Sequence, residues 1–456
     1  MSTTRLSPLD ASFLAVESPT AHMHVGWAAT FSPPPEKPRP SFDELFEHVR
    51  GRLSRDPRFR QRLAPTPLGL NTPLWIDDDE FDPERHIVRA SSATLGEAID
   101  DCMSRQLERD RPLWQLCIAE ELEDGRVGVV GKAHHCMVDG IAAVELAALL
   151  LDPTPEPTPP DEDGWLPAPV PDRLSRLTIG LLDQVRADLG LLRLPARALR
   201  SPAYAMRLAE DGARAARAAL GMLRPARPVH PVNADLSPLR HLAVTELSLS
   251  DLKRIGASFD ATVNDVILAV SAAAVRGMFE ERGETPVALK AMVPVNLRDP
   301  EEDGTSGNRI SFMFVNLPCD EPDPQERLRS IHHETARRKR QGEPHFVSEA
   351  LDAVGYLPQL LRDAVSHVIA SPIVFNLTVS NIPGPTLPMW MLGCELEAAY
   401  PVVPIADGHS MSIGVTTIRD RACFGVYADR KMLPDADVLA AAIHESVDEL
   451  TALSNA

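Results

Sequence analysis

Residues 133–140 read AHHCMVDG and stand between an apolar run and a segment with apolar residues at helical spacing. A histidine ring titrates near neutral pH, so His134 and His135 are both candidate general bases. Asp139 follows four residues later and can shape the turn, while Gly140 permits backbone angles that other residues resist. Two adjacent histidines can also be plain core residues, but an aspartate and a glycine at this spacing favour a catalytic turn.

The segments on either side of this motif predict a hairpin and a helix. Residues 113–121 and 126–132 are apolar strand patterns around an Asp-Gly turn, which is a good hairpin signal. The second strand leads directly into the two histidines. Apolar residues at spacings of three and four over 141–151 then predict a helix with one buried face.

The motif resembles the HHxxxDG signature of coenzyme-A-dependent acyltransferases, the superfamily of chloramphenicol acetyltransferase and peptide-synthetase condensation domains. Five further stretches are similar to those of the bacterial wax ester synthase/diacylglycerol acyltransferase family and follow the same order. They are LSPLD at 6–10, FRQRL at 59–63, PLW at 112–114, VND at 263–265 and NIPGP at 381–385. Together they span nearly the whole chain and make the resemblance specific for this lipid-making family.

The resemblance implies an α/β fold of the α+β type. It would contain two chloramphenicol-acetyltransferase-like domains, each a mixed sheet with helices, and an active-site channel between them. We predict an N-terminal domain over 1–151, a proline-rich linker with basic amphipathic helices over 152–235, and a C-terminal domain over 236–456.

The second half is expected to repeat the strand-and-helix plan without the catalytic motif. Strand patterns occur at 243–249, 287–295, 310–317, 374–380, 411–417 and 422–428, and the last two are expected to form a hairpin. In the first half, helices are expected from Ser41 onward, where Glu44 completes a capping box, and over 95–107. Residues 381–385 contain two prolines and a glycine and predict a turn.

The resemblance assigns the base to His135, because the family places it four residues before the aspartate. His134 would be a structural neighbour, Asp139 would hold the loop through an ion pair, and Gly140 would give the close turn. The superfamily supports an arginine partner for this aspartate, and Arg60 or Arg62 is our candidate.

Two other positions carry open alternatives. Thr262 and Asp265 form a capping-box pattern that gives Asp265 a structural role without catalysis. The family resemblance singles out Asn264 and Asp265, so both are also candidates for the active-site channel.

The pair His332-His333 lacks the aspartate and glycine and predicts an exposed helix. The basic run 337–340 that follows is either a solvated face or a site for coenzyme A phosphates.

Composition excludes several other classes of function. The net charge of −19 argues against nucleic-acid binding, which needs a basic footprint. The six cysteines form no CxxC pair, so we expect buried, reduced thiols, and the resemblance gives Cys136 no role. His22 and His24 would share one face of a strand, but no third ligand is evident, so we expect no metal.

We expect a cytoplasmic protein that meets its substrates at a membrane or lipid-droplet surface. No signal peptide is predicted, and no apolar run reaches the ~18 residues of a transmembrane helix. Residues 173–227 hold eleven arginines against four acidic residues. A basic amphipathic helix can lie on anionic lipid, although a helix packed on the protein with its arginines outward is the equal alternative.

The resemblance implies transfer of a long-chain fatty acyl group from acyl-coenzyme A to diacylglycerol, a long-chain alcohol, or both. Acyl-coenzyme A would be a co-substrate, and no permanently bound cofactor is expected. The coenzyme-A-binding residues are not identified. Two alternatives remain open: acyl transfer to a polyketide or glycolipid hydroxyl, and a non-catalytic protein of lipid surfaces.

Overall fold

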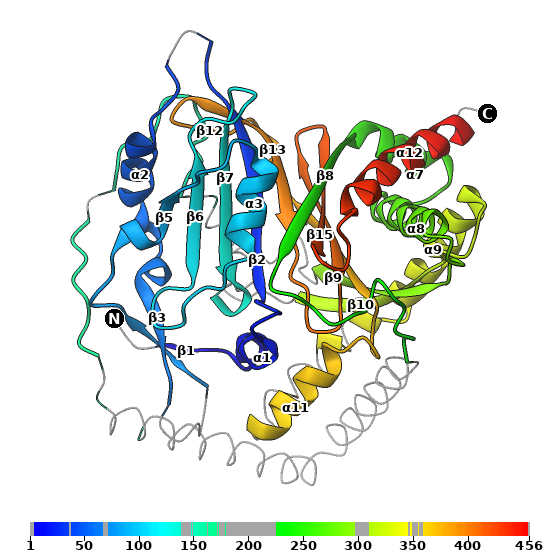
Figure 1. The fold of residues 1–456 in the computed structure, drawn as a ribbon, viewed down its shortest axis with the longest axis horizontal. Helices are drawn as coiled ribbons and strands as arrows, with labels where there is room; N and C mark the ends of the chain where they lie inside the picture. The colour runs from blue at the N-terminus through cyan, green and yellow to red at the C-terminus, as the bar shows by residue number, and fades with distance from the viewer. Residues whose placement is uncertain are drawn as a thin grey trace, which may run out of the picture.

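Two six-stranded mixed sheets stand side by side at the centre of the molecule (Figure 1). The computed structural model describes residues 4–35, 38–66, 72–137, 147, 149–161, 163–170, 172, 178, 225–296, 310–344, 347–348, 354 and 359–454. Helices pack on both sheets, which confirms the predicted α+β type of fold.

The first sheet is built around the strand that leads into the two histidines. Its spatial order is β12 (Trp390–Met391), β13 (Cys394–Val402), β2 (His24–Ser32), β7 (Val127–His134), β6 (Trp114–Ala119) and β5 (Ile87–Arg89). The predicted hairpin is confirmed as β6 and β7, which pair from Trp114 and Ala133 to Ala119 and Gly128. Every residue of β7 is buried, because apolar cores lie against both faces of the sheet.

The second sheet has the order β10 (Ile310–Leu317), β9 (Leu289–Asn296), β11 (Leu377–Pro383), β14 (Met411–Ile418), β15 (Arg421–Asp429) and β8 (Arg240–Ser248). Strand β11 runs parallel to both neighbours, and β14 and β15 form the predicted hairpin. A third, smaller sheet joins β1 (Thr4–Arg5), β4 (Leu74–Asp77) and β3 (Gln61–Ala64).

Helices pack around these sheets. Among the described residues they are α1 (Pro8–Val16), α2 (Phe42–Arg50), α3 (Leu95–Met103), α7 (Leu249–Ser258), α8 (Val263–Glu281), α9 (Pro324–Arg340), α11 (Gln359–Ile369) and α12 (Ala436–Ser454). Both predicted capping boxes are present, at the starts of α2 and α8. They satisfy backbone N–H groups that a helix start otherwise leaves unpaired.

Two sequence predictions placed element ends wrongly. The helix expected to reach Leu107 ends at Met103, because the Leu107 N–H donates to the His24 ring and not to a helix carbonyl. The turn expected at 381–385 begins late, because β11 continues through Pro383 in register with Thr417 of β14. Gly384 then allows a close approach, since a Cβ there would lie 2.4 Å from the Thr417 carbonyl oxygen.

One late segment of the chain belongs to the first sheet. Strand β13 lies within the predicted C-terminal domain but pairs with β2 from Glu395 to Val402. Where β13 reaches the second sheet, a Cβ on Gly425 would lie 2.5 Å from the Pro401 carbonyl oxygen. The domain limits at 151 and 235 stay a prediction, but the first sheet is completed by residues beyond them.

A shared core joins the two sheets. Its buried members come from α3, from strands of the first sheet, and from β8 and β15 of the second.

No single described helix is long and apolar enough to cross a membrane, although α7 and α8 together pass a length-and-composition test as a pair bent by 98°. Most of α8 is buried in the core of the second half, as expected for a core helix.

Candidate active site

His135 begins a single 3-10 turn, η5 (His135–Met137), immediately after β7 ends. Its backbone N–H donates to the Met23 carbonyl at 2.9 Å. Its ring stacks on Phe13 of α1, with centroids 3.7 Å apart and planes inclined by 17°. The LSPLD stretch builds this support, because the Ser7 side chain accepts from the Asp10 N–H and starts α1.

The surroundings of His135 keep its ring neutral. Burial lowers the pKa to about 4, its own backbone works in the opposite direction, and the neighbouring His134 lowers it further. Nδ1 has no hydrogen-bond partner, and no described carboxylate pairs with the ring. The ring is therefore unprotonated at neutral pH and able to accept a proton.

His134 is held by the backbone. The Cys136 N–H donates to Nδ1 at 3.1 Å, so Nδ1 is the acceptor nitrogen of this ring. Nε2 lies 3.6 Å from Glu17 Oε2, and both side chains are 1% exposed. Cys136 is buried as well, and burial raises the pKa of its thiol well above the ordinary range, which disfavours a nucleophilic role.

Glu17 was missed by the sequence analysis. It is the C-terminal cap of α1, accepts from Gln106 Nε2 at 2.8 Å and from Arg109 Nε at 2.6 Å, and faces His134. Burial acts to raise the pKa of its carboxyl, but these three neighbours hold it at about 2. The only sequence signal was a single acidic residue after the apolar pattern of α1.

Two family-like stretches meet beside the histidine strand. The Trp114 indole donates to the Phe59 carbonyl at 2.8 Å, and the two rings lie edge to face at 5.5 Å. Trp114 is opposite Ala133 in the β6–β7 pair. The FRQRL and PLW stretches thus brace the strand that delivers His135.

The other predicted members of the motif are only partly placed. Asp139, Gly140 and most of the helix predicted over 141–151 lie outside the described residues. Arg60 binds Asp163 through both terminal nitrogens, and Arg62 Nε lies 3.2 Å from Asp78. An arginine partner for Asp139 stays a prediction, and both candidates have other acidic partners.

The possible metal pair has other contacts. His24 faces His134 across the β2–β7 pair and accepts from the Leu107 N–H at 3.2 Å. His22 Nε2 lies 3.0 Å from the Pro19 carbonyl oxygen. No cluster of three or more histidine, cysteine or acidic side chains that could hold a metal occurs in the part of the chain the structure describes.

Asp265 is engaged structurally. It closes the capping box with Thr262, accepts from the Thr335 hydroxyl at 2.6 Å, and lies 2.9 Å from His332 Nδ1. Burial acts to raise the pKa of its carboxyl, but these contacts lower it below the ordinary value. Asn264 is half-buried in the same turn, and its role in a channel stays a prediction.

The second histidine pair, His332-His333 on α9, differs in part from expectation. His333 is exposed as predicted, but His332 is half-buried against Asp265, because α9 packs on α8. In the basic run, Arg338 pairs with Glu334 and Glu343. Its guanidinium is therefore already occupied by two carboxylates, and phosphate binding by this run stays a prediction.

Comparison with known proteins gives a consistent result. Residues 6–267 match the family model described as the wax ester synthase/diacylglycerol acyltransferase catalytic domain, and residues 306–451 match the C-terminal domain of the same family. The chain is 32% identical to "Probable diacyglycerol O-acyltransferase tgs1" of Mycobacterium tuberculosis, over 98% of this chain and 96% of that protein.

Two solved structures share the fold. The wax ester synthase/diacylglycerol acyltransferase from Marinobacter aquaeolei VT8 superposes with a TM-score of 0.70 at 24% identity, covering 99% of this chain and all of that one. The starter condensation domain of rhizomide synthetase, in complex with C8-CoA and Leu-SNAC, superposes with a TM-score of 0.55 at 14% identity. The match covers 100% of this chain and 95% of that one. The predicted architecture of two chloramphenicol-acetyltransferase-like domains is thereby confirmed.

Proposed function

The chain belongs to the wax ester synthase/diacylglycerol acyltransferase family and is an O-acyltransferase, and from this we propose that it esterifies a lipid hydroxyl with His135 as general base. The acyl donor is a long-chain acyl-coenzyme A, and the acceptor is diacylglycerol, a long-chain alcohol, or both. The observation that carries the proposal is a neutral histidine ring, stacked on Phe13 and held at the end of β7.

The reaction needs one proton acceptor and one proton donor at the same place. His135 takes the hydroxyl proton as the oxygen attacks the thioester carbonyl carbon, and a tetrahedral oxyanion forms. Collapse breaks the carbon–sulfur bond and expels the coenzyme A thiolate. His135 returns its proton to that sulfur, so the products are an ester and the free thiol.

The absence of a described carboxylate at the His135 ring bears on this step. A buried imidazolium without a counter-ion is unstable, which is why burial lowers the pKa. In our proposal the negative charge of the oxyanion and then of the thiolate offsets the imidazolium. Proton uptake is therefore favourable only while a substrate is reacting.

The residues around His135 orient it. Phe13 sets the plane of the ring, and the backbone bond from His135 to Met23 fixes where η5 starts. The Cys136 N–H donates to Nδ1 of His134, and Glu17 lies 3.6 Å from its Nε2; both contacts position the residue directly before the base. We propose that Asp139 and Gly140 shape the remainder of the turn.

We also propose that the enzyme works at a lipid surface. Helix α1, which lies under His135, packs against α11, as Figure 1 shows. Large apolar side chains are exposed on these helices and just after them: Leu9 at 37%, Leu361 at 56%, Val368 at 63% and Ile373 at 59%. Exposed apolar side chains on helices beside the site suit a peripheral contact with membrane or droplet lipid.

Thiol release from palmitoyl-coenzyme A tests the reaction, with dioleoylglycerol or hexadecanol as acceptor. We expect release that requires an acceptor and is lost in His135→Ala, while His333→Ala, the same change at an exposed histidine, keeps it. Release that His135→Ala leaves unchanged would remove this residue as the base. No release with either lipid would favour a glycolipid or polyketide acceptor, or a non-catalytic role.

A further inference from the structure

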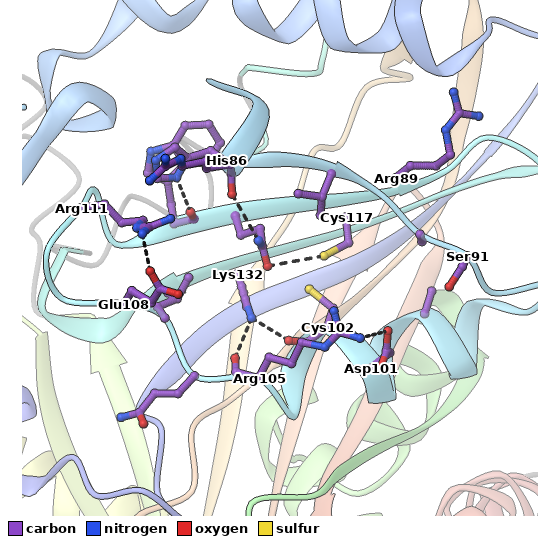
Figure 2. A pocket seen from close by; sticks show the side chains of 18 of the residues that line it. His86, Arg89, Ser91, Asp101, Cys102, Arg105, Glu108, Arg111, Cys117 and Lys132 are labelled. Carbon is purple, nitrogen blue, oxygen red and sulfur yellow. Dashed lines mark hydrogen bonds and ion pairs between the residues drawn. The ribbon is translucent and has the colours of Figure 1, made fainter. Parts of the chain in front are cut away.

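A cavity of about 360 Å³ lies between α3 and the strands β5, β6 and β7 (Figure 2). It is lined by residues from Arg85 to Lys132, and His135 is not among them. The proposed acyl transfer makes no use of this space.

Two thiols meet in this cavity. Cys102 comes from α3 and Cys117 from β6, and Figure 2 shows their sulfur atoms turned toward one another. They are 4% and 6% exposed. All six cysteines are unpaired, but the other four (Cys136, Cys319, Cys394 and Cys423) do not line the cavity.

A buried cation lies beside the two thiols. Lys132 is 1% exposed, and its ammonium donates to the carbonyls of Cys102 and Arg105 at 2.6 and 2.7 Å. No carboxylate of the described residues pairs with it. The carboxylates that line the cavity, Asp101 and Glu108, are paired with arginines. A buried ammonium without a counter-ion favours an anion nearby, and a thiolate is the anion this cavity can supply.

The two thiols are not equivalent. The neighbouring Cys117 side chain lowers the pKa of Cys102 against the opposing effect of burial, and Lys132 lowers it further. The neighbouring Cys102 and burial raise the pKa of Cys117 well above the ordinary range. The Cys117 thiol donates to Gln115 Oε1, which lies 3.8 Å from its sulfur. We therefore assign Cys102, whose carbonyl accepts from Lys132, as the nucleophile, and Cys117, which donates to Gln115, as the second thiol of the pair.

We propose that Cys102 and Cys117 form a hydroperoxide-reactive dithiol site that closes to a disulfide between α3 and β6. The Cys102 thiolate attacks a peroxide oxygen, so a sulfur–oxygen bond forms, the oxygen–oxygen bond breaks, and an alcohol or water leaves. The Cys117 sulfur then attacks the resulting sulfenic acid, forming the disulfide and releasing water. Two thiols are oxidised and one hydroperoxide is reduced.

The disulfide would act near the proposed active site. Lys132 holds the C-terminal end of α3 and lies two residues before His134 on β7. A covalent link from Cys102 to β6 fixes that helix end against the hairpin. Oxidation is therefore expected to change the rate of acyl transfer, and a thiol reductant is expected to restore it.

Peptide mapping of the full chain after treatment with hydrogen peroxide tests the site. We expect the folded protein to lose two of its six thiols and to yield a Cys102–Cys117 crosslinked peptide, reversibly. In Cys117→Ser, Cys102 should remain as a sulfenic acid that a dimedone-type reagent traps. Cys423→Ser is the matched control, because Cys423 is buried in the same core and should leave the crosslink intact.

Three results would overturn the proposal. One is thiol loss spread evenly over the six cysteines, and another is a crosslink between different residues. The third is oxidation only after the protein has unfolded, which circular dichroism of the treated sample detects. Cys102→Ser and Cys117→Ser are nearly isosteric, so failure of either variant to fold is checked directly by its melting temperature.

Discussion

The molecule contains two pairs of adjacent histidines, and their surroundings give them opposite properties. His135 lies at the end of β7 with no described acidic partner, and burial lowers the pKa of its ring to about 4. His332 lies on α9 with its Nδ1 2.9 Å from the buried carboxylate of Asp265. A His-His sequence therefore carries no fixed chemistry, because the groups facing each ring decide whether it can exchange protons with a substrate or is held as a structural contact.

The strongest test of this contrast is removal of each ring. His135→Ala should lower kcat by roughly 10²–10⁴-fold and leave the fold intact, because general-base help is lost. His332→Ala should change kcat far less and act mainly on stability. Thiol-release kinetics together with melting temperatures measure both. Similar kcat losses in the two variants would show that His135 and His332 do not differ in catalytic role.

The pH dependence of catalysis sharpens the same point. A base with a pKa of about 4 becomes protonated only in acid. As the pH is lowered, kcat/KM should therefore fall near pH 4 and not near the ordinary histidine pKa of about 6.5. The measurement is kcat/KM with palmitoyl-coenzyme A across acid pH, on protein shown to be folded at each point. An acidic limb near 6.5 would mean that His135 is not desolvated as described.

On the structural side of the comparison, Asp265→Ala should destabilise the protein by about 3 kcal/mol. The change removes a helix cap and leaves Thr335 and His332 without their buried acceptor. Urea unfolding of the variant beside Asp251→Ala, which changes a half-buried acidic residue in the first turn of α7, measures the difference. Equal unfolding free energies would show that the Asp265 contacts contribute little.

Glu17 links the reactive histidine pair to acid stability. Its carboxyl has a pKa of about 2 in the folded protein, below the value of about 4.3 in an unfolded chain. A depressed carboxyl pKa stabilises the fold above the unfolded value, and this stability is lost as pH falls toward 2. Glu17→Gln should remove about 3 kcal/mol of that pH dependence. If the idea is wrong, the unfolding free energies of variant and parent will fall with the same slope between about pH 5 and about pH 2.

The smallest effect is expected at a third kind of histidine. His241 on β8 lies between Asp100 and Asp437, at 3.0 and 3.2 Å, and Asp100 chiefly raises the pKa of its ring. A raised pKa gives stability that is fully present below the unfolded value and is lost as pH rises through the folded value. His241→Asn should cost about 1 kcal/mol in mild acid and less in alkali. Melting temperatures across that range test the sign.

Short-range features were predictable from the sequence. The capping boxes at Ser41 and Thr262 depend on residues three positions apart, and both are present. The two hairpins were visible from alternation around a turn. The predicted ends of α3 and β11 were wrong, because Leu107 bonds to His24 and Pro383 pairs with Thr417, and both partners lie far along the chain.

The sequence by itself determined the family, the histidine motif and most of the elements, because these are written in local spacing and composition. Only the tertiary structure decided that β13 completes the first sheet, that Glu17 faces His134, and that Cys102 meets Cys117. The physical reason is that an apolar pattern specifies which face of an element is buried. It does not specify which distant element covers that face, since that depends on the packing of the whole chain.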